Sequence, residues 1–297
     1  MNETLTPPDD GSDDIERIQY EKHKEVIETL LAAGALAQAK QYDERFKVGW
    51  FKKITKTQRW LDQFITLDPE MIELKEVVAK LAAPEINDPV LIIGDTGTGK
   101  ELLAKALHGD KQGNFVEINC AGMPDQLIES ELFGHSKGAF TGADKDSIGL
   151  IELAAQDAKG NPARGTLFLD EIGELNINVQ AKLLRVLNDK RLRKVGGKTT
   201  IPVDFRLVSA THCAIGQGDN SKFRTDLYYR ISTFELKTTP LISRREDILE
   251  IVKVLAPDLL KDKLKHGVFL EHLRARDYKG NVRELQSLVR RYQILGK

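Results

Sequence analysis

A glycine-rich turn that ends in a lysine is the stretch whose residue types point most directly to chemistry. Its spacing is that of a P-loop, Gly-x4-Gly-Lys, between a short apolar run and a helical pattern. Backbone N–H groups of such a turn bind phosphate oxygens together with the positive end of the next helix, and the lysine reaches the β- and γ-phosphates. The pattern predicts nucleotide binding and leaves its purpose open. The predicted binding residues are Gly94, Asp95, Thr96, Gly97, Thr98, Gly99, Lys100 and Glu101.

Two adjacent acids end a second apolar run. Asp170 and Glu171 follow residues 166–169, which have the pattern of a buried strand. A buried strand that delivers carboxylates is costly unless they meet a metal or a partner. In a P-loop protein the aspartate would hold Mg²⁺ directly or through water, and the glutamate would polarise the attacking water. The pair favours hydrolysis over binding alone; the other interpretation is a strand that runs into an acidic surface loop.

These residues need a scaffold that brings the ends of separate strands together. Apolar strand patterns alternate with helical ones, which predicts a parallel sheet covered by helices, with ligands at the carboxyl ends of the strands. After about residue 236 the strand patterns stop, which predicts a small all-helical domain at the end of the chain. The predicted strands are 90–93, 115–118, 166–169 and 205–210, and the predicted late helices are 246–256 and 282–294.

Between the two phosphate motifs lies a loop with glycines on both sides of a Phe–Thr tip. The glycines allow such a loop to rise and fold, and the tip exposes an aromatic ring and a hydroxyl. An exposed aromatic in a mobile loop indicates contact with a partner. The predicted partner-binding residues are Gly138, Ala139, Phe140, Thr141, Gly142 and Ala143.

Around this hexapeptide the sequence resembles the AAA+ ATPase domain of sigma-54-dependent transcription activators, the bacterial enhancer-binding proteins. The resemblance covers about residues 66–297. It implies an α/β fold, a P-loop AAA+ three-layer αβα sandwich with a parallel sheet, followed by an all-helical lid. It also implies ATP and Mg²⁺ as ligands, and it accounts for Glu101, because the family has glutamate after the P-loop lysine. Lys279 departs from the pattern, since the family usually has proline there.

The resemblance implies roles for residues outside the two phosphate motifs. Asn119 would restrain Glu171 by donating its amide to it until sigma factor is engaged; a polar cap at a strand end is the other interpretation. Arg283 would contact the γ-phosphate from the lid. Residues 193–197 resemble a second surface loop that supports the sigma-contacting loop, and residues 207–212 match the sensor I strand.

Two arginines would complete the site from a neighbouring subunit. In the family, residues at the positions of Arg224 and Arg230 project into the adjacent nucleotide site, where a guanidinium stabilises charge on the transferring phosphoryl group. The alternative is an ion pair of Arg224 with Asp226 on the surface. An arginine that acts in trans implies a homo-oligomeric ring, and the family forms hexamers.

Composition and patterning divide the chain into four parts. Acids and prolines predict a disordered tail, followed by a helical extension of unknown role. Residues 47–60 interleave basic and aromatic side chains, which is a nucleic-acid-binding pattern in some proteins and a solvated connector more often. The predicted parts are the tail 1–14, the helical extension 15–65, the α/β ATPase subdomain 66–236 and the helical lid subdomain 237–297.

The overall composition bears on the partners. The 44 basic and 45 acidic residues nearly cancel, so net charge indicates neither nucleic acid nor membrane. No apolar run approaches the roughly 20 residues that span a bilayer. We expect a cytoplasmic protein with no membrane partner. No DNA-binding domain is recognised after Arg283, so we expect promoter DNA to be reached only indirectly, and three explanations stay open: a fragment, a natural form without that domain, or DNA contact elsewhere in the chain.

The sequence as a whole predicts an ATP-hydrolysing ring. It would engage the sigma-54 subunit of RNA polymerase through Phe140 and Thr141 and drive promoter opening. One alternative is a regulatory or truncated AAA+ subunit that binds ATP and assembles with other activators without efficient hydrolysis of its own. A second alternative is an AAA+ remodeller of a different substrate, such as a helicase loader.

Overall fold

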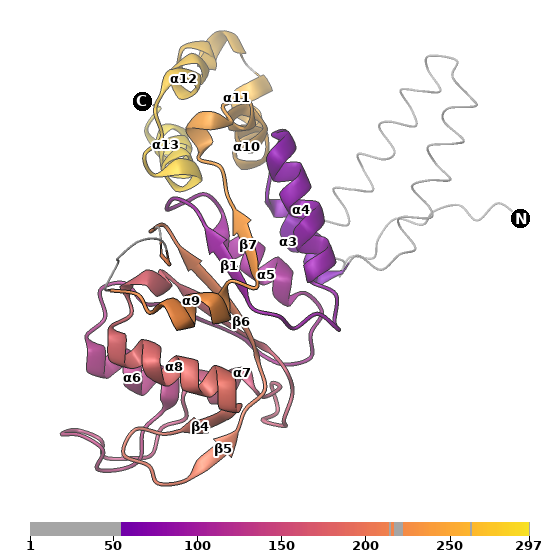
Figure 1. Cartoon of the computed structure of the whole chain (residues 1–297). Coiled ribbons are helices and arrows are strands. Elements are labelled where there is room, and N and C mark those ends of the chain that lie inside the picture. Colours follow the sequence, from indigo (N-terminus) through magenta and orange to yellow (C-terminus); the bar gives the residue numbers. More distant parts are fainter. Residues whose placement is uncertain (1–54, 214, 217–221, 262, 297) are drawn as a thin grey trace, which may run out of the picture. The chain divides into compact units, whose positions relative to one another are not determined.

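A parallel sheet forms the centre of the computed structural model, which describes residues 55–213, 215–216, 222–261 and 263–296 (Figure 1). The strands lie in the order β2-β3-β6-β1-β7, and every neighbouring pair is parallel. The predicted strands are present, and β7 extends the sheet beyond β1. The bounds are β1 (Val90–Ile93), β2 (Phe115–Asn119), β3 (Thr166–Asp170), β6 (Arg206–Thr211) and β7 (Phe234–Lys237).

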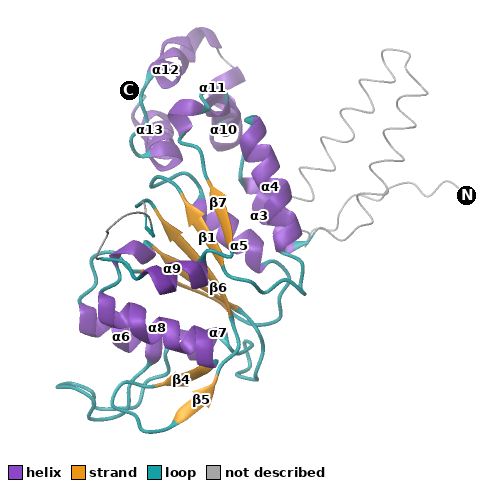
Figure 2. Ribbon diagram, in the orientation of Figure 1, coloured by secondary structure: helices purple, strands orange, loops and turns teal. Residues whose placement is uncertain are grey.

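Helices cover both faces of this sheet because successive strand residues point to opposite sides. Leu91 lies in a core formed with α6, α7, α8 and α9, whereas Ile92 lies in a core formed with α3, α4 and α5. The two cores and the sheet make the expected three-layer αβα sandwich (Figure 2). The bounds are α3 (Lys56–Gln63), α4 (Pro69–Leu81), α5 (Lys100–His108), α6 (Asp125–Phe133), α7 (Leu150–Ala154), α8 (Ile177–Asp189) and α9 (Thr225–Ile231).

The start of α4 shows how the sequence sets a helix boundary. The Asp68 side chain accepts a hydrogen bond from Met71 N at 3.0 Å, and proline occupies the first helical position. Before it, α3 contributes Leu61 to the core beside α5, and Phe64 follows in the same core. Leu61 and Phe64 therefore pack with the ATPase subdomain and Ile65 packs against the helical cluster, although the sequence assigned all three to the extension. The predicted tail and the rest of the extension lie outside the described residues.

Arg206, on β6, connects the C-terminal ends of α4 and α5 to the sheet. This side chain is fully buried, and it donates to the carbonyl oxygens of Leu81 at 2.9 Å, Leu107 at 3.1 Å and Asp88 at 3.1 Å. Burial lowers the pKa of Arg206 to about 10. Leu81 and Leu107 lie in the last turns of α4 and α5, where a cation is favourable because helix C-termini carry partial negative charge.

A separate helical cluster follows the sheet. Its core includes Leu241, Ile248, Leu273 and Leu285, and it contains α11 and α12 in addition to the two predicted helices. None of the helices in the described ranges is long and apolar enough to cross a membrane. The remaining bounds are β4 (Arg191–Arg193), β5 (Thr200–Pro202), the 3₁₀ turns η1 (Ile172–Glu174) and η2 (Leu241–Ser243), α10 (Asp247–Leu255), α11 (Pro257–Lys261), α12 (Lys263–Ala275) and α13 (Asn281–Leu295).

The helical cluster docks on the glycine-rich turn through Gly97. The backbone of Gly97 has φ +80°, in the left-handed region, and its carbonyl accepts a hydrogen bond from Val282 N at 3.0 Å. A Cβ atom at this position would lie 2.4 Å from the carbonyl oxygen of Gly280. Only glycine satisfies both the conformation and the close approach of the two backbones.

We expect Gly97→Ala to lower the free energy of unfolding by roughly 2–5 kcal/mol, because backbone strain adds to overlap with the Gly280 carbonyl. Gly122→Ala is the matched control: Gly122 has φ +73°, but a Cβ atom there meets nothing within 4 Å. The control should lose only about 1–2 kcal/mol, from strain alone. Urea unfolding of both variants measures the difference, and equal losses would contradict the close docking of the lid.

Candidate nucleotide-binding site

The glycine-rich turn connects β1 to α5 and places Lys100 as the first residue of that helix. Lys100 is buried, and its Nζ donates to the carbonyl oxygens of Gly94 at 2.7 Å and Asp95 at 3.3 Å. The hydroxyl of Thr98 donates to the same Asp95 carbonyl at 2.8 Å. Gly99 has φ +106°, a conformation that glycine adopts readily. The predicted P-loop residues thus form one closed turn ahead of a helix N-terminus, which is a favourable site for phosphate.

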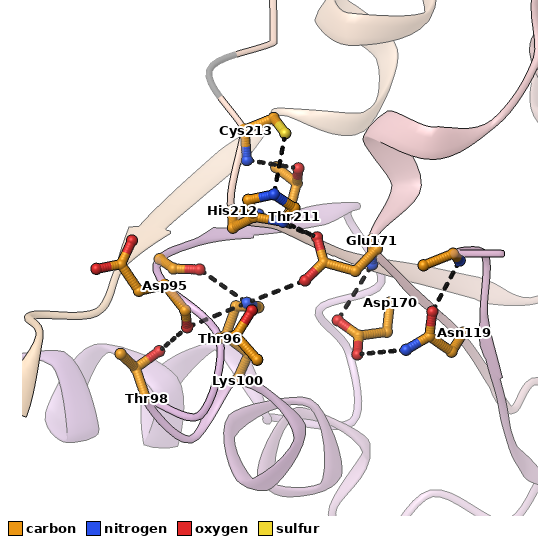
Figure 3. Close-up of polar contacts among 12 residues, drawn as sticks. Asp95, Thr96, Thr98, Lys100, Asn119, Asp170, Glu171, Thr211, His212 and Cys213 are labelled. Carbon is orange, nitrogen blue, oxygen red and sulfur yellow. Dashed lines mark hydrogen bonds and ion pairs between the residues drawn. The ribbon is translucent and has the colours of Figure 1, made fainter. Parts of the chain in front are cut away.

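The two acids lie at the carboxyl end of β3 and point in different directions (Figure 3). Asp170 accepts from the backbone N–H of Glu171 at 3.1 Å. Glu171 has φ +55°, which is uncommon for a residue other than glycine. Its carboxylate accepts from His212 N at 3.2 Å and from His212 Nδ1 at 2.6 Å, and it lies 3.6 Å from Lys100 Nζ. The lysine and the glutamate that the sequence predicted are therefore neighbours in space.

The environment shifts the pKa values of the two carboxyls in opposite directions. Burial, and then the charge of Glu171, raise the pKa of Asp170, and Lys100 opposes this shift only in part. Burial also disfavours ionisation of Glu171, but the hydrogen bonds from His212 and the charge of Lys100 outweigh it and lower the pKa of this carboxyl. Glu171 is thus ionised at neutral pH, and its lowered pKa makes it a weaker base than a free glutamate side chain.

The sequence predicted a hydrogen bond from Asn119 to Glu171, but in the structure Asn119 is bonded to Asp170. Among the described contacts, the Asn119 amide donates to Asp170 at 3.5 Å, and its oxygen accepts from Ala121 N at 2.8 Å. Asn119 and Asp170 are register partners on β2 and β3, so their side chains share one face of the sheet. Glu171 lies beyond that register in a left-handed turn, which directs its carboxylate toward β6 and His212.

His212 is the contact that sequence reasoning missed. The sequence places His212 at the end of the sensor I strand but does not predict its hydrogen bonds to Glu171. The signal was present in its position, because residues at the carboxyl ends of adjacent parallel strands meet at one edge of the sheet. In the structure β6 lies next to β3, and His212 follows β6 directly.

The two arginines predicted to act in trans lie on or beside α9. Arg224 forms a two-pronged pair with Asp226, with Nε–Oδ1 at 3.0 Å and Nη2–Oδ2 at 2.7 Å. Arg230 Nη2 donates to the Leu187 carbonyl at 3.1 Å. None of these described contacts brings either arginine to the P-loop turn of its own chain. The ion pair given as the alternative from sequence is thus present in this isolated chain.

Gln180 anchors the start of α9 and was not predicted. Its side chain is fully buried in α8, and its amide donates to the carbonyls of Leu175 at 2.7 Å and Lys222 at 2.8 Å. Its oxygen accepts from Arg224 N at 2.8 Å. A buried glutamine with these partners fixes the backbone from which the Arg224 side chain extends. A polar residue on an otherwise apolar helix face was the available signal.

Arg283 lies beside the turn from the lid side. It follows Val282, whose backbone N–H is bonded to Gly97, and its Cβ lies 3.2 Å from the position that a Cβ on Gly97 would take. The base of its side chain is therefore adjacent to the P-loop, as expected for a residue that contacts phosphate from the lid.

The predicted partner-binding loop is closed by its own backbone. Gly138 N donates to the Ala143 carbonyl at 2.8 Å, and both Gly138 and Gly142 have positive φ. Phe140 is 37% exposed, and its ring packs edge-on against His135 with ring centres 5.0 Å apart. Ser136 N donates to the Val195 carbonyl at 3.0 Å, which ties the base of this loop to the segment after β4. The second surface loop expected at 193–197 is therefore its direct neighbour.

The sequence is similar to a known protein family and to several bacterial regulators. Residues 64–237 match the Sigma-54 interaction domain family. The Nif-specific regulatory protein of Azospirillum lipoferum is 43% identical over 242 residues, which cover 78% of this chain and 37% of that protein. The DNA-binding transcriptional regulator NtrC of Rhizobium meliloti is 45% identical over 233 residues, covering 76% of this chain and 46% of that protein. The chain thus spans less than half the length of these two relatives.

A solved structure supports the same relationship. NtrX from Brucella abortus, solved in complex with ATP, superposes with a TM-score of 0.64 and 28% sequence identity, covering 91% of this chain and 56% of that one. The sequence match covers the P-loop, the two acids at the carboxyl end of β3 and the Gly-Ala-Phe-Thr-Gly-Ala loop. The chain belongs to the Sigma-54 interaction domain family.

Proposed function

We propose that this chain hydrolyses ATP and uses the energy to remodel RNA polymerase that carries sigma-54, so that promoters open. The observation that carries the proposal is the convergence of a P-loop lysine, Lys100, with an ionised glutamate, Glu171, at the carboxyl edge of the sheet. The printed names of the relatives, which are transcriptional regulators, and the ATP complex of NtrX support it. We expect this activity to take place in the cytoplasm.

The P-loop turn suits the triphosphate of ATP. Backbone N–H groups at the start of α5 and the Lys100 ammonium supply positive charge for phosphate oxygens. Among the described residues, no three His, Cys, Asp or Glu side chains lie together as a metal site. Asp170, at the carboxyl end of β3, is the residue that would hold Mg²⁺, directly or through a water. When bound, Mg²⁺ neutralises charge on the phosphates.

Glu171 is placed to act as the general base. Glu171 is ionised at neutral pH and lies 3.6 Å from the P-loop lysine, so it can accept a proton from the water that attacks the γ-phosphorus while ADP leaves. His212 donates two hydrogen bonds to one oxygen of this carboxylate and thereby fixes its orientation. Lys100 Nζ lies 3.6 Å from the other oxygen, and to reach phosphate it would exchange this weak contact and its hydrogen bonds to the carbonyls of Gly94 and Asp95.

The arginines require a second copy of the chain. Arg224 is paired with Asp226 at an exposed site, where solvent screens the attraction and an ion pair contributes little to stability. Exchange of this partner for a phosphate of a neighbouring subunit is therefore inexpensive. We infer a homo-oligomeric ring, with the hexamer of the family as its expected size, in which Arg224 and Arg230 stabilise charge on the transferring phosphoryl group.

The Gly138–Ala143 loop supplies the sigma-54 contact. Phe140 is partly exposed and rests on His135 through one edge-on ring contact, which leaves its ring available to a partner. Thr141 is exposed beside it. Gly138 and Gly142 both have positive φ, a conformation that glycine adopts readily, and a Cβ atom at either position would meet no atom within 4 Å.

A second candidate function is a subunit that binds ATP and joins rings of other activators without efficient hydrolysis of its own. The Arg224–Asp226 pair is compatible with it, because this arginine has a partner within its own chain. The catalytic geometry at Glu171 favours the hydrolysing ring.

Steady-state ATP hydrolysis, measured against protein concentration, distinguishes these two functions. For a ring with shared sites, specific activity should rise with concentration, and Glu171→Ala should reduce the rate by at least about 100-fold. A flat and near-zero rate at every concentration would contradict the hydrolysing ring and favour the assembling subunit.

Phe140→Ala should abolish binding to sigma-54 in the presence of ADP and aluminium fluoride, because it removes the exposed ring at the loop tip. ATP hydrolysis should be retained, since the described contacts of Phe140 do not include the residues at the nucleotide site. Val254→Ala, which truncates another exposed apolar side chain on α10, is the control and should bind normally. Unchanged sigma-54 binding by Phe140→Ala would refute this role of the loop.

A further inference from the structure

Asn281 is a buried polar residue for which the proposed chemistry has no use. It begins α13, two residues before Arg283, and only 1% of its surface is exposed. Its Nδ2 donates to the Thr96 carbonyl at 3.0 Å, and its Oδ1 accepts from Leu241 N at 2.7 Å. One side chain therefore bridges the P-loop turn, the η2 turn that opens the lid, and the helix that carries Arg283.

The partners fix how this amide is oriented. The carbonyl oxygen of Thr96 can only accept a hydrogen bond and the Leu241 N–H can only donate, so a flipped amide would lose both bonds. The backbone of Asn281 has φ +51°, a left-handed conformation that asparagine tolerates better than most residues other than glycine. Few residue types other than asparagine combine this backbone with one donor and one acceptor at these positions.

Neighbouring contacts tie the same turn to the lid. Val282 N donates to the Gly97 carbonyl at 3.0 Å, directly after the bond from Asn281 to residue 96. The hydroxyls of Thr98 and Thr238 lie 2.8 Å apart, and Arg244 Nη2 donates to the Thr98 carbonyl at 3.3 Å. Three consecutive P-loop residues are thus bonded to the segment 238–282. A movement of the turn is transmitted to the start of α13 through these bonds.

We propose that Asn281 is a positioning residue that keeps α13 in step with the P-loop and so places Arg283 for the γ-phosphate. This inference rests on the proposed nucleotide site and on the role of Arg283 in it. The proposal predicts a different effect on each of the two nucleotides. Loss of the amide weakens binding of the triphosphate, which has a γ-phosphate for Arg283 to contact, and leaves binding of ADP nearly unchanged.

The test compares fluorescent ADP with a fluorescent non-hydrolysable ATP analogue, both with Mg²⁺. We expect Asn281→Gly, whose backbone suits the positive φ, to weaken the ATP analogue about five- to tenfold and ADP less than about twofold. Arg283→Ala should likewise weaken binding of the ATP analogue more than binding of ADP. The double variant Asn281→Gly/Arg283→Ala should bind no more weakly than Arg283→Ala alone, because residues that act through one another are not additive.

Two further variants separate positioning from stability. Asn281→Asp still accepts from Leu241 N but cannot donate to the Thr96 carbonyl, so it should lose the same selectivity for the triphosphate. Lys190→Gly is the matched backbone control, since Lys190 also has φ +51° and directly follows α8 as its C-cap. It should change the affinity for neither nucleotide. Thermal unfolding of every variant confirms that each one is folded at the temperature of the titration.

Equal losses for both nucleotides, or additive losses in the double variant, would overturn the proposal, because a purely structural residue behaves in that way. Normal selectivity in Arg283→Ala would overturn it as well, since Asn281 would then have no contact to position. Failure of the unmodified chain to bind either nucleotide would instead refute the nucleotide site itself, and the role of Asn281 with it.

Discussion

The burial of one carboxylate constrains the arrangement of the whole candidate site. Glu171 is only 8% exposed, and a buried charge is tolerated only with charged or hydrogen-bonding partners. Its partners are Lys100 from the turn after β1 and His212 from the end of β6. They meet it because β6 lies between β3 and β1 in the sheet. The order of the strands therefore produces the site as directly as the residues themselves do.

The P-loop turn is held from two sides, and this links chemistry to movement. On one side Lys100 lies 3.6 Å from Glu171 at the sheet edge, and on the other the carbonyls of Thr96 and Gly97 accept hydrogen bonds from α13. A nucleotide bound in the turn would thus contact the same backbone segment that is hydrogen-bonded to the lid. These shared bonds are sufficient to couple nucleotide binding to the position of the lid.

Sequence patterns predicted the parts of the fold and site that depend on neighbours in the chain. The alternation of strands and helices predicted a parallel sheet covered by helices, and the P-loop spacing predicted the turn, because both are local features. The partner of Glu171 was predicted as Asn119 but is His212, since that choice depends on strand register and on a left-handed turn. Buried bridging residues such as Gln180 and Asn281 leave no periodic pattern, so only the folded chain reveals their contacts.

Mixing two inactive variants tests the central claim of a shared hydrolytic site most directly. Glu171→Gln lacks the general base and Arg224→Ala lacks the arginine supplied to a neighbour, so neither should hydrolyse ATP appreciably alone. In mixed rings some sites combine an intact Glu171 with an intact Arg224, and part of the activity should return. No recovery at any ratio, although the two variants assemble together, would contradict a site completed between copies of this chain.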